Sequence, residues 1–227
     1  MTPLSFTPAA ILFDMDGLMI DSERAGLDCW CQASAEFGLD FDEAFLHRMV
    51  GLHERLCREL VERTYPDRDL AAMFHRTNEL YVASIDAGLP LKPGIVPLLQ
   101  WVEEIGMPKA VATSTRRQTA ELNLERTGLR RYFEVVVTGS DIEHPKPAPD
   151  VYLKTAAQLG IAPHQCLVLE DSEPGVRAAL AAGMTPLQIP DMKQPSPEFL
   201  ALGHRVLDSL AAAHALLRDT FRTAQPS

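Results

Sequence analysis

From residue 108 onward, short continuous apolar runs alternate with stretches whose apolar residues recur every three or four positions. The continuous runs are typical of strands buried on both faces, and the periodic stretches are typical of helices. The predicted strands are the one that ends at Phe13 and residues 109–113, 133–138, 166–169, 185–189 and 205–207; the predicted helices are residues 118–127, 150–159, 175–182 and 208–217. This alternation predicts an α/β fold, a doubly wound and mostly parallel sheet with helices on both faces.

The segment of residues 18–88 breaks this alternation. It holds no strand-like run, and its apolar residues, such as Leu27, Trp30 and Ala33, recur at helical spacing. We therefore expect an inserted all-helical domain. The predicted division of the chain is an α/β core of residues 9–17 and 92–217, a helical insert of residues 18–88, and a flexible tail of residues 218–227.

Composition and charge narrow the possible partners. The chain has 227 residues and a formal net charge of −10, which argues against nucleic acid and acidic membranes as partners. No apolar stretch approaches the ~20 residues of a membrane span. The four cysteines lack metal-ligand spacing, which favours buried reduced thiols in a cytoplasmic protein. We expect a monomer that binds a small phosphorylated substrate.

The candidate chemistry begins directly after the first strand, where Asp14 and Asp16 precede Gly17. Alternate residues of an extended chain point the same way, so both carboxylates can face one small space. Two like charges that close are costly unless a cation or a proton separates them, and Mg²⁺ prefers oxygen ligands of this kind. One carboxylate could then act as a nucleophile and the other as an acid or base. On these residues alone, a turn after a strand explains the pattern equally well.

Three later segments favour an active site. Residues 111–114 are an apolar run ending in hydroxyls, residues 144–150 place Lys146 between two prolines, and residues 166–172 are an apolar run followed by two acids. Together with Asp14 and Asp16, and in this order, they resemble the four-motif signature of the haloacid dehalogenase-like superfamily. The resemblance covers roughly residues 9–190. It is closest to the β-phosphoglucomutase-like phosphatase branch, whose members carry a helical cap.

The candidate side chains follow different strands of the predicted sheet. Ligands of open α/β sheets bind at the carboxyl ends of the strands. We therefore expect one crevice to hold the six candidates Asp14, Asp16, Ser114, Lys146, Glu170 and Asp171.

The resemblance implies a role for each of these residues. Asp14 would be the nucleophile that forms an aspartyl-phosphate, and Asp16 the acid and base, with its backbone carbonyl on the metal. Lys146 would balance charge on Asp14 and the phosphoryl oxygens. Asp171 would bind Mg²⁺ directly, and Glu170 would either bind the metal or support a ligand.

Phosphate binding and specificity have weaker candidates. Ser114 is expected to hydrogen-bond the phosphoryl group, and Thr115 to add a backbone N–H, although a hydroxyl before a helix is often only an N-cap. The possible specificity residues are His53, Glu54 and Arg55 in the insert, which the resemblance places near the active site, and Arg116 at the start of a helix.

Together with these residues, the resemblance implies a Mg²⁺-dependent phosphatase acting on a small phosphorylated sugar, polyol or nucleoside. The alternatives are a phosphomutase of the same branch, a dehalogenase, and a receiver-like phospho-accepting signalling module. The helical insert and the position of Asp16 beside Asp14 argue for turnover and against a receiver. The mutase branch has anion-binding cap residues at places that hold Gly26, Val50 and Ala83 in this chain, with Arg55 as the nearest substitute.

Overall fold

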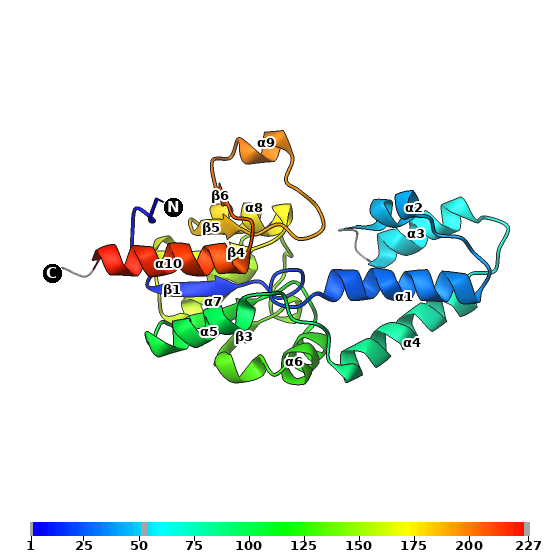
Figure 1. The fold of residues 1–227 in the computed structure, drawn as a ribbon, viewed down its shortest axis with the longest axis horizontal. Coiled ribbons are helices and arrows are strands. Elements are labelled where there is room, and N and C mark those ends of the chain that lie inside the picture. The colour runs from blue at the N-terminus through cyan, green and yellow to red at the C-terminus, as the bar shows by residue number, and fades with distance from the viewer. Residues whose placement is uncertain (1, 51–53, 225–227) are drawn as a thin grey trace.

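The computed structural model describes residues 2–50 and 54–224 and contains a six-stranded sheet (Figure 1). The strands are β1 (Ala10–Phe13), β2 (Lys109–Ala112), β3 (Val135–Val137), β4 (Cys166–Glu170), β5 (Thr185–Gln188) and β6 (Arg205–Val206). Their order in the sheet is β3-β2-β1-β4-β5-β6, and every neighbouring pair is parallel. The predicted doubly wound α/β fold is therefore confirmed.

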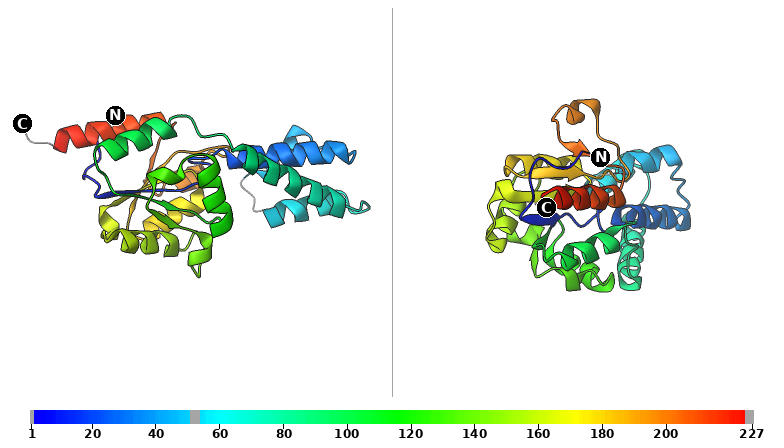
Figure 2. Two further views of the ribbon diagram at one scale, coloured as in Figure 1. Left: turned by 90° about the horizontal axis from the view of Figure 1, so that it is seen from below. Right: turned by 60° about the vertical axis from the view of Figure 1, so that its left-hand side comes forward.

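Helices cover both faces of this sheet. They are α5 (Ile95–Glu104), α6 (Arg117–Arg126), α7 (Asp150–Leu159), α8 (Glu173–Ala181), the short α9 (Pro197–Leu200) and α10 (Leu210–Ala224), with 3₁₀ turns η1 (Arg130–Tyr132), η2 (Gly139–Asp141) and η3 (Pro163–Gln165). Alternate residues of β1 serve the two faces. Ile11 and Phe13 belong to the apolar cluster of α5, α6 and α10, while Ala10 and Leu12 belong to that of α7 and α8. Figure 2 shows α5 and α10 on one side of the sheet and α7 and α8 on the other.

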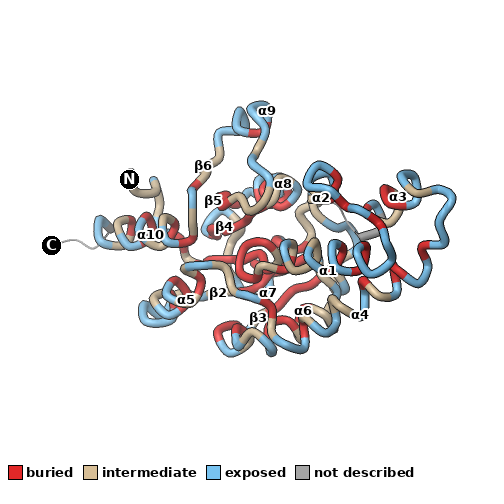
Figure 3. The backbone as a smooth tube through the Cα atoms, turned by 45° about the vertical axis from the view of Figure 1, so that its right-hand side comes forward, coloured by how far each residue is buried: buried red, intermediate tan, exposed pale blue. Residues whose placement is uncertain are grey.

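The segment between β1 and α5 forms four helices beside the sheet (Figure 1). They are α1 (Ser22–Glu36), α2 (Glu43–Met49), α3 (Glu54–Thr64) and α4 (Ala71–Ala87). These helices, called the cap below, bury an apolar cluster of their own in which the rings of Trp30 and Phe74 meet edge to face at 5.8 Å. Figure 3 shows the same arrangement, with buried residues lining the inner sides of these helices and exposed residues on their outer sides.

Two linkers join the cap to the core and run side by side. The Asp21 N–H donates to the Pro90 carbonyl at 2.8 Å, and the Lys92 N–H donates to the Met19 carbonyl at 2.9 Å. Between them, Ile20 and Leu91 form an antiparallel bridge. Both connections therefore leave the core at one point of the molecule.

The expected tail is partly wrong. Helix α10 continues through residues 218–224, because its buried face extends beyond Leu217. The hydroxyl of buried Thr220 accepts a hydrogen bond from the Leu4 N–H at 3.0 Å, and the Phe221 ring lies 5.8 Å from that of Trp101.

All four cysteines are free, but Cys31 is exposed, so the expectation of buried thiols is correct for only three of them. Across the described part of the chain, no helix has both the length and the apolar character needed to cross a membrane.

Candidate active site

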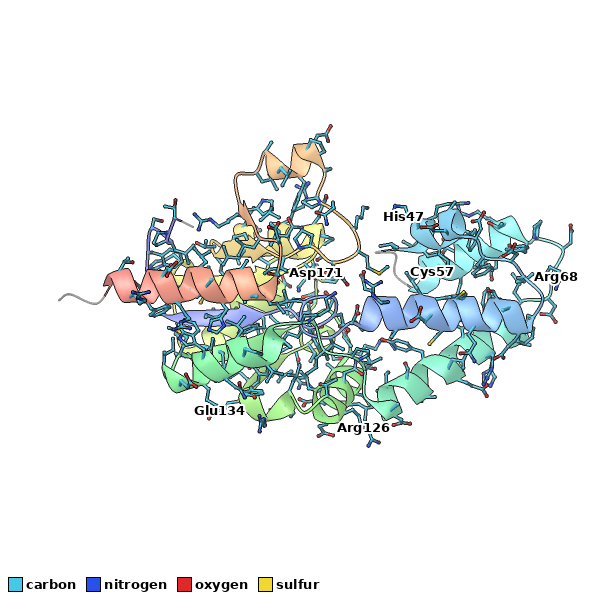
Figure 4. The ribbon with its side chains drawn as sticks, viewed as in Figure 1. His47, Cys57, Arg68, Arg126, Glu134 and Asp171 are labelled. Atoms are coloured by element: carbon cyan, nitrogen blue, oxygen red, sulfur yellow. The ribbon has the colours of Figure 1, made fainter. Side chains whose placement is uncertain are left out.

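The carboxyl ends of three adjacent strands meet at a cavity of about 580 Å³ between the core and the cap. Asp14 follows β1, Thr113 follows β2, and Asp171 follows β4, and all three line this cavity. Lys146 reaches the same place from the segment before α7. Figure 4 shows Asp171 in the core, on the side toward the cap. The structure therefore brings the strand-end residues predicted from the sequence into one space.

Lys146 lies between two buried carboxylates. Its Nζ contacts Asp14 Oδ1 directly, lies 2.7 Å from Glu170 Oε1, and donates to the Ala112 carbonyl at 3.2 Å. Burial alone would lower the pKa of the Lys146 ammonium, but Asp14 and Glu170 together hold that pKa well above its usual value. Burial raises the pKa of Asp14 to about 8, although Lys146 opposes the shift. Burial would also raise the pKa of Glu170, yet Lys146 and the Ser172 donors bring it below its usual value.

Asp171 completes a compact group of carboxylates. Among the described residues, oxygens of Asp14, Glu170 and Asp171 all lie within 4.8 Å of one another. Burial, followed by Glu170 and Asp14, raises the pKa of Asp171 well above its usual value. The Lys146 ammonium therefore contacts two of these three buried carboxylates, and an oxygen donor set of this kind suits a hard divalent cation. The residues fit a metal ion.

Two glycines make this close approach possible. Gly17 has φ +79°, and a Cβ on it would lie 2.4 Å from Asp171 Oδ2. A Cβ on Gly175 would lie 1.5 Å from Glu170 Oε1. Any side chain at either position would displace the carboxylate beside it.

The Asp16 carboxylate lies apart from the group of three. It faces the cavity and accepts hydrogen bonds from Ser22 Oγ at 2.8 Å and from Thr115 Oγ1 at 2.6 Å. Ser22 is the first residue of cap helix α1 and Thr115 follows β2, so Asp16 is held from both domains. Its side chain is therefore placed to exchange a proton with a molecule in the cavity.

The hydroxyl residues after β2 differ in what they contact. Ser114 is exposed and lines the cavity as predicted. The Thr115 N–H, which was expected to bind the phosphoryl group, donates to Thr113 instead, and the Thr115 hydroxyl donates to Asp16. Thr113, which we did not predict as a site residue, is buried and lines the cavity; its Oγ1 accepts the Thr115 N–H at 3.0 Å and lies 3.4 Å from Asp16 Oδ2. The available signal was its position directly after Ala112, the last residue of β2, just as Asp14 follows Phe13.

The family model described as "Haloacid dehalogenase-like hydrolase" matches residues 11–189. The chain belongs to the haloacid dehalogenase-like hydrolase family. The family predicted from the four motifs is thus confirmed, and so is the prediction of a hydrolytic enzyme.

Curated relatives and solved structures support this membership. The fructose-1-phosphate phosphatase YqaB of Escherichia coli (strain K12) is 33% identical over 186 residues, which cover 80% of this chain and 96% of that protein. The phosphorylated carbohydrates phosphatase of Thermotoga maritima is 31% identical over 176 residues, covering 77% and 82% of the two chains. A crystal structure of a HAD family hydrolase from Deinococcus radiodurans R1, with bound phosphate and sodium, has a TM-score of 0.80 at 28% identity and covers 94% of this chain and 96% of its own.

Of the four predicted specificity residues, the structure describes the side chain of Arg116 only. His53 lies outside the described residues, and so do the side chains of Glu54 and Arg55, which begin α3. Arg116 is exposed before α6 and is absent from the described lining of the cavity.

Several cap residues that line the cavity were not predicted from the sequence. They include Trp30 of α1, Arg58 of α3, and Phe74, Asn78 and Tyr81 of α4. Helical periodicity was the available signal for Arg58, which lies one turn after Glu54. Gly26 and Val50, two of the places compared with the mutase branch, also line the cavity.

Proposed function

We propose that this hydrolase is a Mg²⁺-dependent phosphatase that removes the phosphoryl group from a small phosphorylated sugar, polyol or nucleoside. The observation that carries the proposal is the contact of a buried carboxylate, Asp14, with Lys146 at the base of a cavity that Asp16 also lines. The relatives that are named as phosphatases of fructose 1-phosphate and of phosphorylated carbohydrates favour a sugar phosphate. A cavity of about 580 Å³ accommodates a ligand of that size.

The positions of Asp14, Asp16 and Lys146 suit a two-step transfer. An Asp14 oxygen forms a bond to phosphorus while the ester P–O bond breaks, and Asp16 gives its proton to the leaving oxygen. Asp16 then takes a proton from the water that attacks phosphorus, and the bond between phosphorus and Asp14 breaks to release inorganic phosphate. Lys146 stays beside Asp14 in both steps and balances negative charge on the phosphoryl oxygens.

The metal would be held by Asp14 and Asp171, whose carboxylate oxygens converge with those of Glu170. Glu170 already accepts four hydrogen bonds, so it would support the site and not bind the metal itself. When bound, Mg²⁺ supplies the positive charge that lets an anionic nucleophile approach an anionic phosphoryl group. Thr113 and Ser114, which follow β2, also bring hydroxyl groups to the lining of the cavity. These donors suit phosphoryl oxygens.

The expected acceptor of the phosphoryl group is water and not a sugar hydroxyl. A mutase must hold a second phosphate in its cap while the sugar turns round. Gly26 and Val50, which line the cavity at two of the places compared with the mutase branch, have no side chain that can bind an anion. This supports hydrolysis over transfer of the phosphoryl group to a sugar hydroxyl.

The four free cysteines suit a cytoplasmic enzyme, and we expect it to act as a monomer, which size-exclusion chromatography would check.

The test is release of inorganic phosphate from a panel of phosphorylated sugars, polyols and nucleosides, with p-nitrophenyl phosphate as a generic ester. We expect multiple turnovers with Mg²⁺, none in excess EDTA, and the highest kcat/KM on a sugar or polyol phosphate. Turnover that persists in EDTA would contradict the metal requirement. Conversion of β-glucose 1-phosphate into glucose 6-phosphate faster than phosphate release, with a bisphosphate primer present, would identify a mutase instead.

A further inference from the structure

Tyr152, in the first turn of α7, is a fully buried residue beneath the active site. Its hydroxyl donates to Glu170 Oε1 at 3.1 Å. A buried hydroxyl is costly unless it is hydrogen-bonded, and here its partner is one of the three clustered carboxylates. Tyr152 does not line the cavity itself among the described residues, so any effect on chemistry must act through a neighbour.

Glu170 is held at both of its carboxylate oxygens. Oε1 accepts from Tyr152 and from Lys146, and Oε2 accepts the Ser172 N–H at 2.7 Å and the Ser172 hydroxyl at 2.9 Å. A carboxylate offers about four lone-pair positions, and each of these four donors has one of them. The close approach of Gly175 leaves the carboxylate little room to shift. Glu170 is thus fixed by its surroundings, and Tyr152 supplies one of its four donors.

The ring of Tyr152 also supports Lys146. Lys146 Nζ lies 4.9 Å from the ring centroid, within the range of a cation–π contact. The same Nζ contacts Asp14, the proposed nucleophile. Tyr152 therefore touches both partners of the Lys146–Glu170 ion pair, and through Lys146 it reaches Asp14.

The two contacts of Tyr152 can be separated chemically. A phenylalanine at this position would keep the ring and its packing against Lys146, and would lose only the hydroxyl that reaches Glu170.

We propose that Tyr152 is a positioning residue whose hydroxyl holds Glu170, and with it Lys146, in the arrangement that Asp14 and a divalent cation require. The inference rests on the proposed function where its readout is turnover, but its effect on the carboxylate group does not need a substrate. Hydrogen-bond partners of metal-site carboxylates contribute to both metal affinity and activity.

The test compares the Tyr152→Phe variant with Tyr132→Phe. Tyr132 is a matched control, because it is also buried and its hydroxyl accepts from Arg131 at 2.6 Å, away from the carboxylates. We expect Tyr152→Phe to bind Mg²⁺ about tenfold more weakly by calorimetry on the resting protein, and to lose about tenfold in kcat with KM within about twofold. Tyr132→Phe should match the wild type in both measurements.

The two readouts separate this inference from the proposed function. If the wild type binds Mg²⁺ but turns over no phosphate ester, the proposed function fails, and the calorimetry of Tyr152→Phe still decides the inference. If Tyr152→Phe binds Mg²⁺ as tightly as the wild type, the inference is wrong. A lower melting temperature with unchanged kcat and Mg²⁺ affinity would show that the hydroxyl is only structural.

Discussion

At the scale of single residues, the active site concentrates negative charge where water is largely excluded. Asp14, Glu170 and Asp171 are all buried, and Lys146 is the ammonium that contacts two of them. The pKa shifts follow from this arrangement. Asp14 and Asp171 hold protons more tightly than free carboxylates, whereas Glu170, which has the most donors, holds its proton less tightly. A divalent cation would take the place of those protons.

This competition predicts a pH-dependent stabilisation by Mg²⁺. Burial raises the pKa of Asp14 from 3.8 to about 8, so the metal-free folded protein binds this proton more tightly than the unfolded chain does. The contribution of Asp14 protonation to folding stability is complete below the pKa of the unfolded chain, 3.8, and is lost as the pH rises through about 8. The increase in melting temperature on adding Mg²⁺ should therefore grow as the pH is raised through this window, because metal binding no longer has to displace a proton.

Thermal unfolding in a pH series, with saturating Mg²⁺ and with EDTA, measures this effect. As the pH is raised from about 5.5 to 8, we expect the Mg²⁺-induced increase in melting temperature to become larger. An increase of equal size at both ends of the series would show that Asp14 does not compete with the metal for a proton.

At the scale of elements, the bounds of a helix were predicted correctly where residues that start or stop helices flank it. Helix α7 has the predicted bounds because Pro149 precedes it and Gly160, with φ +69°, ends it. The end of α10 was missed because the polar pair Arg218 and Asp219 interrupts the pattern, although the next residue, Thr220, returns to the buried face.

The site was predictable at its strand ends and not in its cap. Asp14 and Asp171 follow apolar runs whose ends meet in any parallel sheet. In the cap helices, the side chains that face the cavity and those that face the apolar core recur at the same helical spacing, so the sequence pattern does not distinguish them. Trp30 and Phe74 do both, since they belong to the cap's apolar cluster and also line the cavity. Only the packing of the helices separates the two roles.

Helix α3 offers a matched test of specificity. Arg58 lines the cavity with its guanidinium 5.3 Å from the Phe74 ring centroid, while Arg63, on the same helix, is exposed and donates to the Glu59 carbonyl at 3.2 Å. We expect Arg58→Ala to raise KM for the preferred phosphorylated sugar by about tenfold, the size of one lost hydrogen bond to a charged group. Turnover of p-nitrophenyl phosphate should change little, because this ester has no sugar hydroxyls to bind.

Steady-state kinetics on both substrates gives the answer, with Arg63→Ala as the control that should behave like the wild type. An equal loss on both substrates, accompanied by a lower melting temperature, would show that Arg58 supports the fold of the cap and does not select the substrate.

At the scale of the whole molecule, the cap and the core meet over the active site and are joined at the paired linkers. Lys92, in the second linker, contacts Asp191 of the segment after β5, and its Nζ lies 3.6 Å from Asp21 Oδ1 of the first linker. This cation therefore ties both linkers to the core. Ser22 extends the connection to the active site, since it begins α1 and donates to Asp16.

Removing the Lys92 charge should alter the motion of the cap. In Lys92→Met we expect kcat and KM to change together, because hinge residues control closure over the substrate. Lys193→Met is the control, since Lys193 is exposed in the same segment as Asp191. Steady-state kinetics that match the wild type in both parameters would show that the ion pair does not constrain the hinge.

The central claim is that Asp14 accepts the phosphoryl group, and turnover by Asp14→Asn tests it most directly. An amide has nearly the same shape as the carboxylate but is a poor nucleophile, so the variant should fold and lose activity. Asp28→Asn, which changes an exposed carboxylate on α1, controls for the loss of one charge. We expect phosphate release by Asp14→Asn to fall by about three orders of magnitude or more, with Asp28→Asn unchanged. If the folded Asp14→Asn variant kept about a tenth of wild-type turnover, a loss far smaller than removal of a nucleophile produces, covalent catalysis by Asp14 would be contradicted.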